Sequence, residues 1–222
     1  MKLKNIAIDG PAGAGKSTIA RRVAAELNLI YVDTGAMYRA IALYMIRQNI
    51  RPEETAKVES VLPDVQVRIA YQDGEQQVFL GEENVSGLIR TPEISAGASA
   101  FATIGSVRRK LVAMQQELAK ETAVVMDGRD IGTTVLPDAY LKVYLTASVE
   151  VRAKRRMAEL AAKGQEVDLH AVEEDIRARD YQDMHREESP LRKADDAHEV
   201  DTSDLSIEEV TEAILALYQE GN

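Results

Sequence analysis

The segment that most constrains the fold of this chain is residues 10–18, with the sequence Gly-Pro-Ala-Gly-Ala-Gly-Lys-Ser-Thr. Its first and third glycines and its lysine and serine match the phosphate-binding loop pattern G-x-x-x-x-G-K-[ST]. Residues 3–8 before it read as a short buried strand, and residues 17–27 after it carry apolar side chains at helical spacing. Because strand, loop and helix is the context that the pattern requires, we predict a phosphate-binding loop rather than a chance match in a glycine-containing turn.

The residue types in this loop are suited to holding the phosphates of a nucleotide. Glycines let the backbone turn tightly and point consecutive N–H groups inward, and the helix N-terminus adds partial positive charge. We expect Lys16 to reach the β- and γ-phosphates and the Ser17 hydroxyl to bind Mg²⁺. The residues predicted to bind ATP are Gly10, Pro11, Ala12, Gly13, Ala14, Gly15, Lys16, Ser17 and Thr18.

Length and composition limit the classes of protein that fit. The 222 residues suit one large domain, and the absence of cysteine excludes disulfides, thiolate metal sites and cysteine nucleophiles. A net charge of −10 disfavours nucleic acid as a partner, so an anionic ligand has to be held by local arginines. No apolar run is long enough to cross a membrane and no secretory segment is apparent. We therefore expect a cytoplasmic protein with no membrane partner.

Strand and helix patterns alternate along most of the chain. Further buried strands are expected at residues 29–32, 123–127, 141–145 and 198–202. Residues 206–209 form a capping box, which predicts a C-terminal helix that packs on the sheet through a face including Ile207 and Val210. Alternation of this kind predicts an α/β fold, with a parallel sheet of about five strands and helices on both faces. Ligands of such sheets bind at the carboxyl ends of the strands, which is where residues 10–18 and 33–35 both lie.

Two segments depart from this alternation. Residues 65–69 alternate apolar and polar side chains, residues 76–80 read as a second strand, and Asp73-Gly74 between them is a hairpin signal. They predict an inserted antiparallel subdomain at residues 64–100. Residues 148–186 read as two charged helices, and we expect them to form a lid and the helix that follows the lid. The expected single domain, residues 1–222, then has its core at residues 1–63, 101–147 and 187–222.

Charged residues follow the predicted strands. Asp127 ends an apolar strand, where an acid in phosphate-loop proteins often lies near Mg²⁺, so Ser17 and Asp127 are the predicted metal ligands. Arg129 in the next turn can bind phosphate through two parallel hydrogen bonds. Arg39 lies one turn into a helix that is expected to begin at residue 36, and it either faces the same cleft or is solvated. The basic residues 108–110 oppose the dipole of the helix that they begin, so either one is kept for an anion or all are tolerated surface charges.

Two later helices, which Ser148 and Asp168 are expected to cap, each carry a charged face. Arg152, Arg155 and Arg156 are spaced by three and four residues and share one face, which is either a solvated surface or the arginine set of a closing lid. Arg179, Asp183 and Arg186 also share a face. That face fits an intrahelical salt-bridge stripe better than a ligand surface on spacing alone.

These features distinguish among phosphate-loop proteins. A G protein needs the guanine-reading sequence N-K-x-D, which is absent. A small kinase needs a short chain and several arginines to neutralise the charge on the transferred phosphoryl group. The arginines available are at positions 39, 129, 152, 155, 156, 179 and 186. We expect direct in-line phosphoryl transfer, because positioning and electrostatics can then supply most of the rate.

The chain resembles the bacterial cytidylate kinase family along essentially its whole length. The matching motifs are residues 8–18, 33–39, 127–132 and 177–180. The antiparallel segment at residues 64–100 also resembles the enlarged nucleoside-monophosphate-binding (NMP-binding) region of that family. The resemblance implies a P-loop NTPase-type fold with an inserted antiparallel NMP-binding subdomain and a helical lid.

The resemblance also implies roles for individual residues. The set expected around the cytosine base is Thr34, Ser99, Arg108 and Asp130. The set expected on the acceptor phosphate is Arg39, Arg129 and Arg186, with Arg179 and Asp183 on the ribose. This favours the ligand interpretation of the later helix face. The residues expected to act in catalysis are Lys16, Arg129, Arg155 and Arg156, the last two from the lid.

The implied activity is Mg²⁺- and ATP-dependent phosphorylation of CMP and dCMP to CDP and dCDP by a monomer. One alternative is another small kinase, such as a shikimate or dephospho-coenzyme A kinase, which does not need Ser99, Arg108 and Asp130 to read a base. A second alternative is a regulator that binds ATP without turnover. Such a switch has no need of a second set of arginines.

Overall fold

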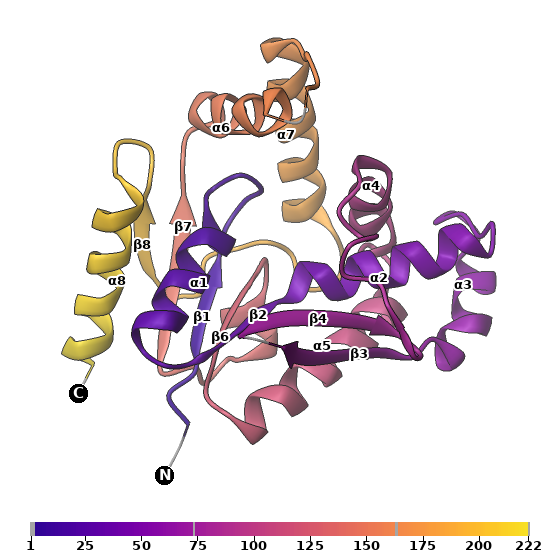
Figure 1. Cartoon of the computed structure of the whole chain (residues 1–222), viewed down its shortest axis with the longest axis horizontal. Coiled ribbons are helices and arrows are strands. Elements are labelled where there is room, and N and C mark those ends of the chain that lie inside the picture. Colours follow the sequence, from indigo (N-terminus) through magenta and orange to yellow (C-terminus); the bar gives the residue numbers. More distant parts are fainter. Residues whose placement is uncertain (1–2, 73, 163, 222) are drawn as a thin grey trace. The chain divides into compact units, whose positions relative to one another are not determined.

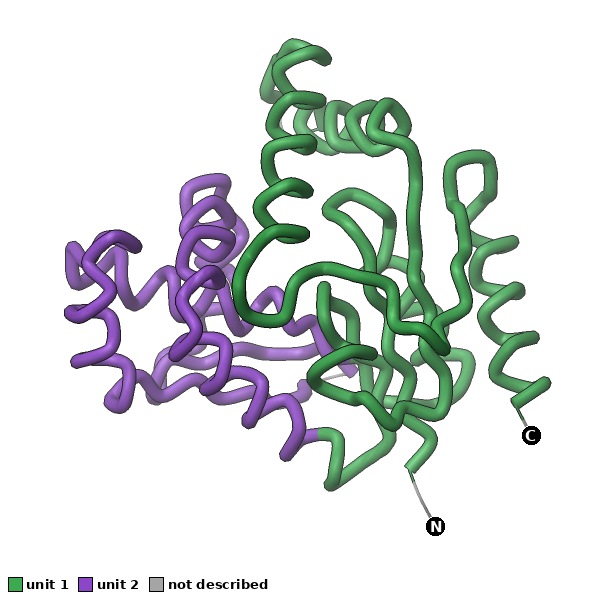
Figure 2. Tube along the Cα trace, turned by 180° about the vertical axis from the view of Figure 1, so that it is seen from behind, with its two compact units in different colours: residues 1–31, 119–222 green, residues 32–118 purple. Residues whose placement is uncertain are grey.

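The computed structural model of the chain describes residues 3–72, 74–162 and 164–221. The chain forms two compact units, coloured separately in Figure 2. Unit 1 consists of residues 1–31 and 119–222, and unit 2 consists of residues 32–118. The predicted phosphate-binding loop lies in unit 1, and the predicted insertion at residues 64–100 lies inside unit 2.

The larger of the two sheets has five strands, and all but the end of β2 belongs to unit 1. In spatial order the strands are β2 (Ile30–Asp33), β6 (Val124–Gly128), β1 (Ile6–Asp9), β7 (Leu141–Thr146) and β8 (His198–Asp201) (Figure 1). β1 pairs in parallel with both β6 and β7, and β7 pairs in parallel with β8. All four residues of β1 are buried, as in a strand covered on both faces. The predicted parallel sheet is confirmed, although β1 begins at Ile6 rather than at residue 3.

Two helices of unit 1, α1 (Lys16–Glu26) and α8 (Ile207–Glu220), pack beside each other on this sheet. Ile19 and Val23 of α1 and Ile214 of α8 share one apolar cluster with the strands. Burial of such side chains contributes roughly 1.5–3 kcal/mol each to folding. The phosphate-binding loop is therefore held between a buried strand and a firmly packed helix.

The N-terminus of α8 shows the predicted capping box. The Ser206 hydroxyl accepts a hydrogen bond from the Glu209 backbone N–H at 3.2 Å, and the Glu209 carboxylate accepts one from the Ser206 N–H at 2.8 Å. Ile207 was expected on the buried face but is 46% exposed. The buried face begins one turn later, at Val210.

Two further helices of unit 1, α6 (Val149–Ala161) and α7 (Leu169–His185), pack on each other through Ala153, Val172 and Ile176. As predicted, Ser148 caps α6 and Asp168 caps α7, each accepting a hydrogen bond from a backbone N–H three residues later. The π-helical turn at Ile131–Val135, between β6 and β7, was not predicted.

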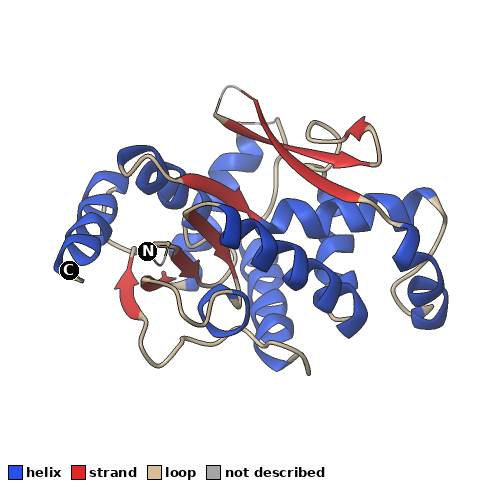
Figure 3. Cartoon of the chain, turned by 90° about the horizontal axis from the view of Figure 1, so that it is seen from below, coloured by secondary structure: helices blue, strands red, loops and turns tan. Residues whose placement is uncertain are grey.

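Unit 2 combines helices with the smaller sheet, whose antiparallel strands were predicted (Figure 3). Its helices are α2 (Thr34–Arg47), α3 (Thr55–Val61), α4 (Pro92–Phe101) and α5 (Gly105–Glu121), which ends in unit 1, and a 3-10 turn lies at Leu62–Asp64. Its strands, in spatial order, are β3 (Val67–Gln72), β4 (Glu75–Leu80) and β5 (Glu83–Asn84). Asp73 of the predicted hairpin signal lies outside the described residues, whereas Gly74 has the left-handed φ of 78° that such a turn uses.

Two helices of unit 2 differ from the expectation. α2 begins at Thr34 rather than at residue 36, because the Asp33 carboxylate accepts a hydrogen bond from the Ala36 N–H at 2.9 Å and so caps the helix. α4 was not predicted, since its small residues carry little apolar periodicity. It packs closely on α2: a Cβ added at Gly97 would lie 3.3 Å from the Ala42 Cβ. None of the helices in the described ranges is long and apolar enough to span a membrane.

Candidate active site

The phosphate-binding loop of unit 1 has the backbone geometry that its glycines predict. Gly10, with a φ of 148°, lies so close to β7 that an added Cβ would be 2.0 Å from the Leu145 carbonyl oxygen. Gly13 and Gly15 have φ values of 77° and 86°, in the region that side chains disfavour. Gly15 then leads directly into α1. The loop therefore cannot tolerate a side chain at Gly10 without moving away from β7.

Lys16 lies at the N-terminus of α1 with its side chain buried. Its ammonium group donates a hydrogen bond to the Pro11 carbonyl oxygen at 2.7 Å, across the loop. Burial lowers the pKa of Lys16 well below its ordinary value, and the nearby charge of Arg129 lowers it further, whereas Asp127 acts in the opposite direction. A phosphate beside this ammonium would favour its charged form.

Ser17 and Asp127, the predicted metal ligands, contact each other. The Ser17 hydroxyl donates a hydrogen bond to Asp127 Oδ2 at 2.8 Å, and the Tyr31 hydroxyl donates one to Asp127 Oδ1 at 2.8 Å. In the described ranges, no three or more His, Cys, Asp or Glu side chains are grouped so that they could hold a metal ion. A hydroxyl beside one carboxylate nevertheless fits Mg²⁺, which usually takes one or two protein oxygens together with substrate phosphates and water.

Four charged residues of unit 1 that were predicted to bind the acceptor form one cluster. Arg129 Nε donates a hydrogen bond to Asp183 Oδ2 at 2.8 Å. The guanidinium of Arg186 lies 3.5 Å from both Asp130 and Asp183. Two further hydrogen bonds, to the Ser189 carbonyl oxygen at 2.8 and 2.5 Å, fix the plane of that guanidinium. The strand end after β6 and the C-terminal end of α7 are thus joined by alternating positive and negative charges.

Burial gives this cluster its electrostatic character. The side chains of Asp130, Asp183 and Arg186 are each less than one tenth exposed. Burial raises the pKa of Asp183, but the guanidinium groups of Arg129, Arg186 and Arg179 outweigh it, so the pKa stays below its ordinary value. Arg179, on α7, therefore acts on the same carboxylate, as the predicted face implies.

The predicted residues of unit 2 lie on three of its helices. Arg39 of α2 pairs with Asp33 at 2.8 Å, and Gly35 leaves room for that pair, because an added Cβ would lie 3.1 Å from the Arg39 guanidinium. Thr34 is buried at the start of α2, and Ser99 is half-buried on α4. Thr34 and Arg39 thus both lie in the first two turns of α2, which Asp33 caps.

Arg108 differs from its basic neighbours on α5. Its side chain is buried, with the guanidinium 5.5 Å from the centre of the Tyr38 ring and 3.4 Å from the Ala102 carbonyl oxygen. Lys110 instead donates a hydrogen bond to the Leu62 carbonyl oxygen at 2.6 Å and so fastens α5 to the turn after α3. Two alternatives were open at residues 108–110, and the burial of Arg108 disfavours a tolerated surface charge at that position.

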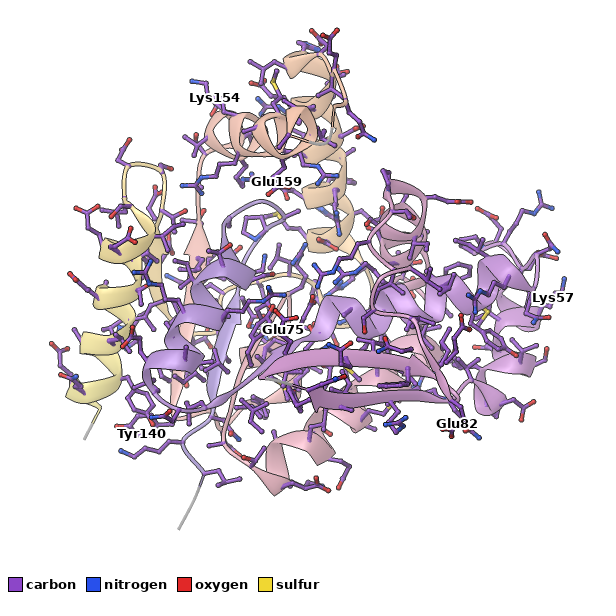
Figure 4. All side chains as sticks on the ribbon, in the orientation of Figure 1. Lys57, Glu75, Glu82, Tyr140, Lys154 and Glu159 are labelled. Carbon is purple, nitrogen blue, oxygen red and sulfur yellow. The ribbon has the colours of Figure 1, made fainter. Side chains whose placement is uncertain are left out.

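The predicted lid arginines of α6 have different surroundings. Arg155 donates hydrogen bonds to the Thr202 hydroxyl at 3.0 Å and to its carbonyl oxygen at 2.6 Å, just after β8. Arg156 is 42% exposed and bonds Glu159 of its own helix at 3.1 Å; Figure 4 labels Glu159. Arg152 is buried. The three arginines therefore do not act as one face, although their spacing suggested it.

Comparison with known proteins places this chain in a family. A sequence model of the cytidylate kinase family matches residues 6–220. The chain is 52% identical to the cytidylate kinase of Caldicellulosiruptor bescii, over 98% of this chain and 96% of that protein. It is 45% identical to the cytidylate kinase of Halalkalibacterium halodurans, over 99% of each. The chain belongs to the cytidylate kinase family.

Solved structures with a similar fold share little sequence with this member of the cytidylate kinase family. A gluconokinase from Sinorhizobium meliloti aligns with a TM-score of 0.51 and 14% identity, over 99% of this chain and 93% of that one. A shikimate kinase from Acinetobacter baumannii, in complex with shikimate, aligns with a TM-score of 0.50 and 18% identity, over 99% and 95%. These likenesses show that the fold of this chain is shared with a gluconokinase and a shikimate kinase.

Sequence reasoning missed one buried carboxylate in this cytidylate kinase family member. Asp9, the last residue of β1, accepts hydrogen bonds from the backbone N–H groups of Ile131 at 2.8 Å and Gly132 at 2.7 Å. It thereby holds the turn that carries Arg129 and Asp130. Asp9 ends a buried strand directly before the phosphate-binding loop, and Asp127 ends a later buried strand. The pattern that identified Asp127 could therefore have identified Asp9 from the sequence.

Two other contacts could not be read from the sequence. Tyr31 orients Asp127, yet an aromatic residue in a buried strand does not distinguish packing from hydrogen bonding. Arg152 forms an ion pair of 2.7 Å with Asp180, 28 residues later in the sequence. Only the packing of α6 on α7 brings that pair together.

Proposed function

We propose that this protein transfers the γ-phosphoryl group of ATP to CMP, and to dCMP, giving ADP with CDP or dCDP. The observation that carries the proposal is the cluster of Arg129, Asp130, Asp183 and Arg186 in unit 1, which supplies two fixed guanidinium groups and two carboxyl groups. Guanidinium groups suit the acceptor phosphate, and carboxylates suit the hydroxyl and amino donors of a nucleoside. The cytidylate kinases of related bacteria supply the substrate class.

On the donor side, residues 10–18 bind the phosphates of ATP through backbone N–H groups and the Lys16 ammonium. The support is the left-handed φ at Gly13 and Gly15 and the position of Lys16 at the start of α1. Ser17 and Asp127 hold Mg²⁺, which when bound neutralises charge on the phosphates. Tyr31 keeps the Asp127 carboxylate in place through its hydroxyl.

On the acceptor side, the monophosphate is bound through its base, its phosphate and its ribose. The proposed contacts to the cytosine base are Thr34, Ser99, Arg108 and Asp130. Arg39, Arg129 and Arg186 bind the acceptor phosphate, and Arg179 and Asp183 bind the ribose. A site built to hydrogen-bond cytosine rejects other bases, because they leave its buried polar groups unpaired. The contact of Asp183 does not require the 2′-hydroxyl, which is why we include dCMP.

The transferring phosphoryl group is stabilised by Lys16, Arg129, Arg155 and Arg156. For Arg156 this role requires the side chain to leave Glu159, with which it makes only an exposed ion pair of little net stability. We propose that residues 148–186 comprise a lid and the helix that follows it, and that the lid makes this change and excludes water during transfer. We further propose that the working unit is a monomer.

The proposal is tested by measuring ATP consumption with Mg²⁺ against CMP, dCMP, UMP, AMP, GMP and shikimate, with the products identified by chromatography. We expect fast turnover with CMP and dCMP and little with AMP, GMP or shikimate. Turnover with UMP equal to that with CMP would show that the assigned contacts of Arg108 and Asp130 to the base are wrong. Absence of turnover with every nucleotide would refute the proposed function.

A further inference from the structure

Arg152 is buried at a point where three segments of unit 1 meet. Its side chain is only 5% exposed, and each nitrogen has its own partner. Nε donates to the Ala147 carbonyl oxygen at 2.9 Å, after β7, and Nη1 donates to the Ala12 carbonyl oxygen at 3.1 Å, within the phosphate-binding loop. Nη2 lies 2.7 Å from Asp180 Oδ2, on α7. Only a guanidinium offers donors in a fixed plane to three such partners.

The loop is fitted closely to this side chain. A Cβ added at Gly13 would lie 3.2 Å from the Arg152 Cβ, and 3.6 Å from its Cγ. The loop backbone at residues 12–13 therefore rests on the stem of Arg152 as well as on its guanidinium. Because packed protein interiors deform little, a displacement of Arg152 must also displace the loop backbone.

Asp180 is the other end of this connection. It lies on the same buried face of α7 as Asp183, one turn earlier, and each of the two carboxylates is paired with an arginine from outside α7. Asp180 Oδ1 is buried without a hydrogen-bond partner in the described part of the chain. The ion pair with Arg152 is therefore the main interaction that stabilises the charge of Asp180 there. Loss of one partner from a buried pair leaves an uncompensated charge, which is strongly destabilising locally.

We infer that Arg152 is a positioning residue that joins the phosphate-binding loop to α7 through Asp180, so that a change on α7 alters the binding of ATP. The inference rests on the proposed function in assigning CMP contacts to Arg179 and Asp183, which flank Asp180 on α7. Through this connection the phosphate-binding loop and α7 are held in a fixed position relative to each other within unit 1. Neither Arg152 nor Asp180 needs to touch a substrate for this role.

The chain provides a matched control for the variant. Arg177 of α7 and Glu150 of α6 also form an ion pair between these two helices, at 3.7 Å, but both side chains are more than half exposed. Among the residues that the structure describes, this pair makes no hydrogen bond or ion pair with residues 10–18, and Glu150 acts on Arg152 only through its charge. Removing it by Glu150→Gln tests the effect of losing an α6–α7 ion pair without disturbing the phosphate-binding loop.

The experiment measures the dissociation constant of Mg·ATP by calorimetry in the absence of CMP, and that of CMP in the absence of ATP. For Asp180→Asn we expect the constant for Mg·ATP to rise about three- to ten-fold, which lies within the range of effects at coupled positions outside a binding site. We expect Glu150→Gln to leave it unchanged. Arg152→Lys keeps a charge opposite Asp180 but cannot reach all three partners, so we expect it to weaken Mg·ATP binding to a similar extent.

Several outcomes overturn the inference. Unchanged Mg·ATP affinity in Asp180→Asn, with or without weaker CMP binding, would mean that α7 does not act on the loop. Equal weakening by Glu150→Gln would mean that general loosening of α6 and α7 is responsible. If circular dichroism shows that Asp180→Asn is unfolded, Arg152→Lys decides by the same criterion. Because the ATP measurement contains no CMP, its result stands even if the wild-type protein does not phosphorylate CMP.

Discussion

At the scale of single residues, Asp9 shows how a buried charge is used to shape the site. Burial raises its pKa from 3.8 to about 6, and the neighbouring Asp130 acts in the same direction. Hydrogen bonds from Gly132 and Ile131 and the charge of Lys16 act in the opposite direction. The folded protein thus keeps a costly carboxylate because that group can accept both backbone N–H groups at once.

This pKa predicts how the contribution of Asp9 to stability changes with pH. A carboxyl whose pKa is raised on folding stabilises the folded state while protonated, and this contribution is lost as pH rises through the folded value. The complete shift is worth roughly 3 kcal/mol, and from pH 4.5 to 7.5 we therefore expect the wild type to lose about 2 kcal/mol relative to Asp9→Asn.

The measurement is urea denaturation of both proteins from pH 4.5 to 7.5. The amide in Asp9→Asn does not titrate, so the variant serves as the control. The common background of other groups cancels in the difference in the free energy of unfolding between the two proteins. A difference in the free energy of unfolding that is constant with pH, or that grows in favour of the wild type as pH rises, contradicts the assignment.

At the scale of elements, the local sequence predicted where helices start better than it predicted whether a helix is present. The caps at Ser148, Asp168 and Ser206 were all read correctly, because a side chain that accepts from the backbone three residues later is a purely local contact. α4 was missed because its small residues derive their helical stability from packing on α2, which no local pattern records. The π-helical turn at Ile131–Val135 likewise depends on Asp9, more than a hundred residues away.

The capping box of α8 supports a prediction on stability. Ser206→Ala removes the acceptor for the Glu209 N–H, so we expect it to lower the free energy of unfolding by about 1 kcal/mol. The exposed Ser60→Ala in α3, where the hydroxyl bonds only the carbonyl oxygen of Lys57, is the control and should change stability by less than about 0.5 kcal/mol. Chemical denaturation measures both. A Ser206→Ala protein as stable as the wild type, or one with altered Michaelis constants, would argue against a purely structural cap.

At the scale of the whole molecule, the sequence predicted the parallel sheet, the phosphate-binding loop and the antiparallel segment, because each has its own periodicity or spacing. On spacing alone it favoured a salt-bridge stripe over a ligand face for Arg179, Asp183 and Arg186. The structure shows why: Asp183 and Arg186 do pair, at 3.5 Å, but Arg129 and Asp130 from a distant strand end join them. A charged face that recruits partners across the fold cannot be recognised from one helix alone.

The central claim is that this cluster binds the phosphate of CMP, and Arg186→Lys tests it most directly. Lysine keeps the charge but loses the planar pair of donors, and hydrogen bonds to a charged group contribute about 1.5–3 kcal/mol. In steady-state kinetics we expect kcat/KM for CMP to fall about ten- to a hundred-fold, with the KM for ATP little changed. The exposed Arg192→Lys should behave as the wild type. If Arg186→Lys matches Arg192→Lys with CMP, the acceptor phosphate is bound elsewhere and the account is wrong.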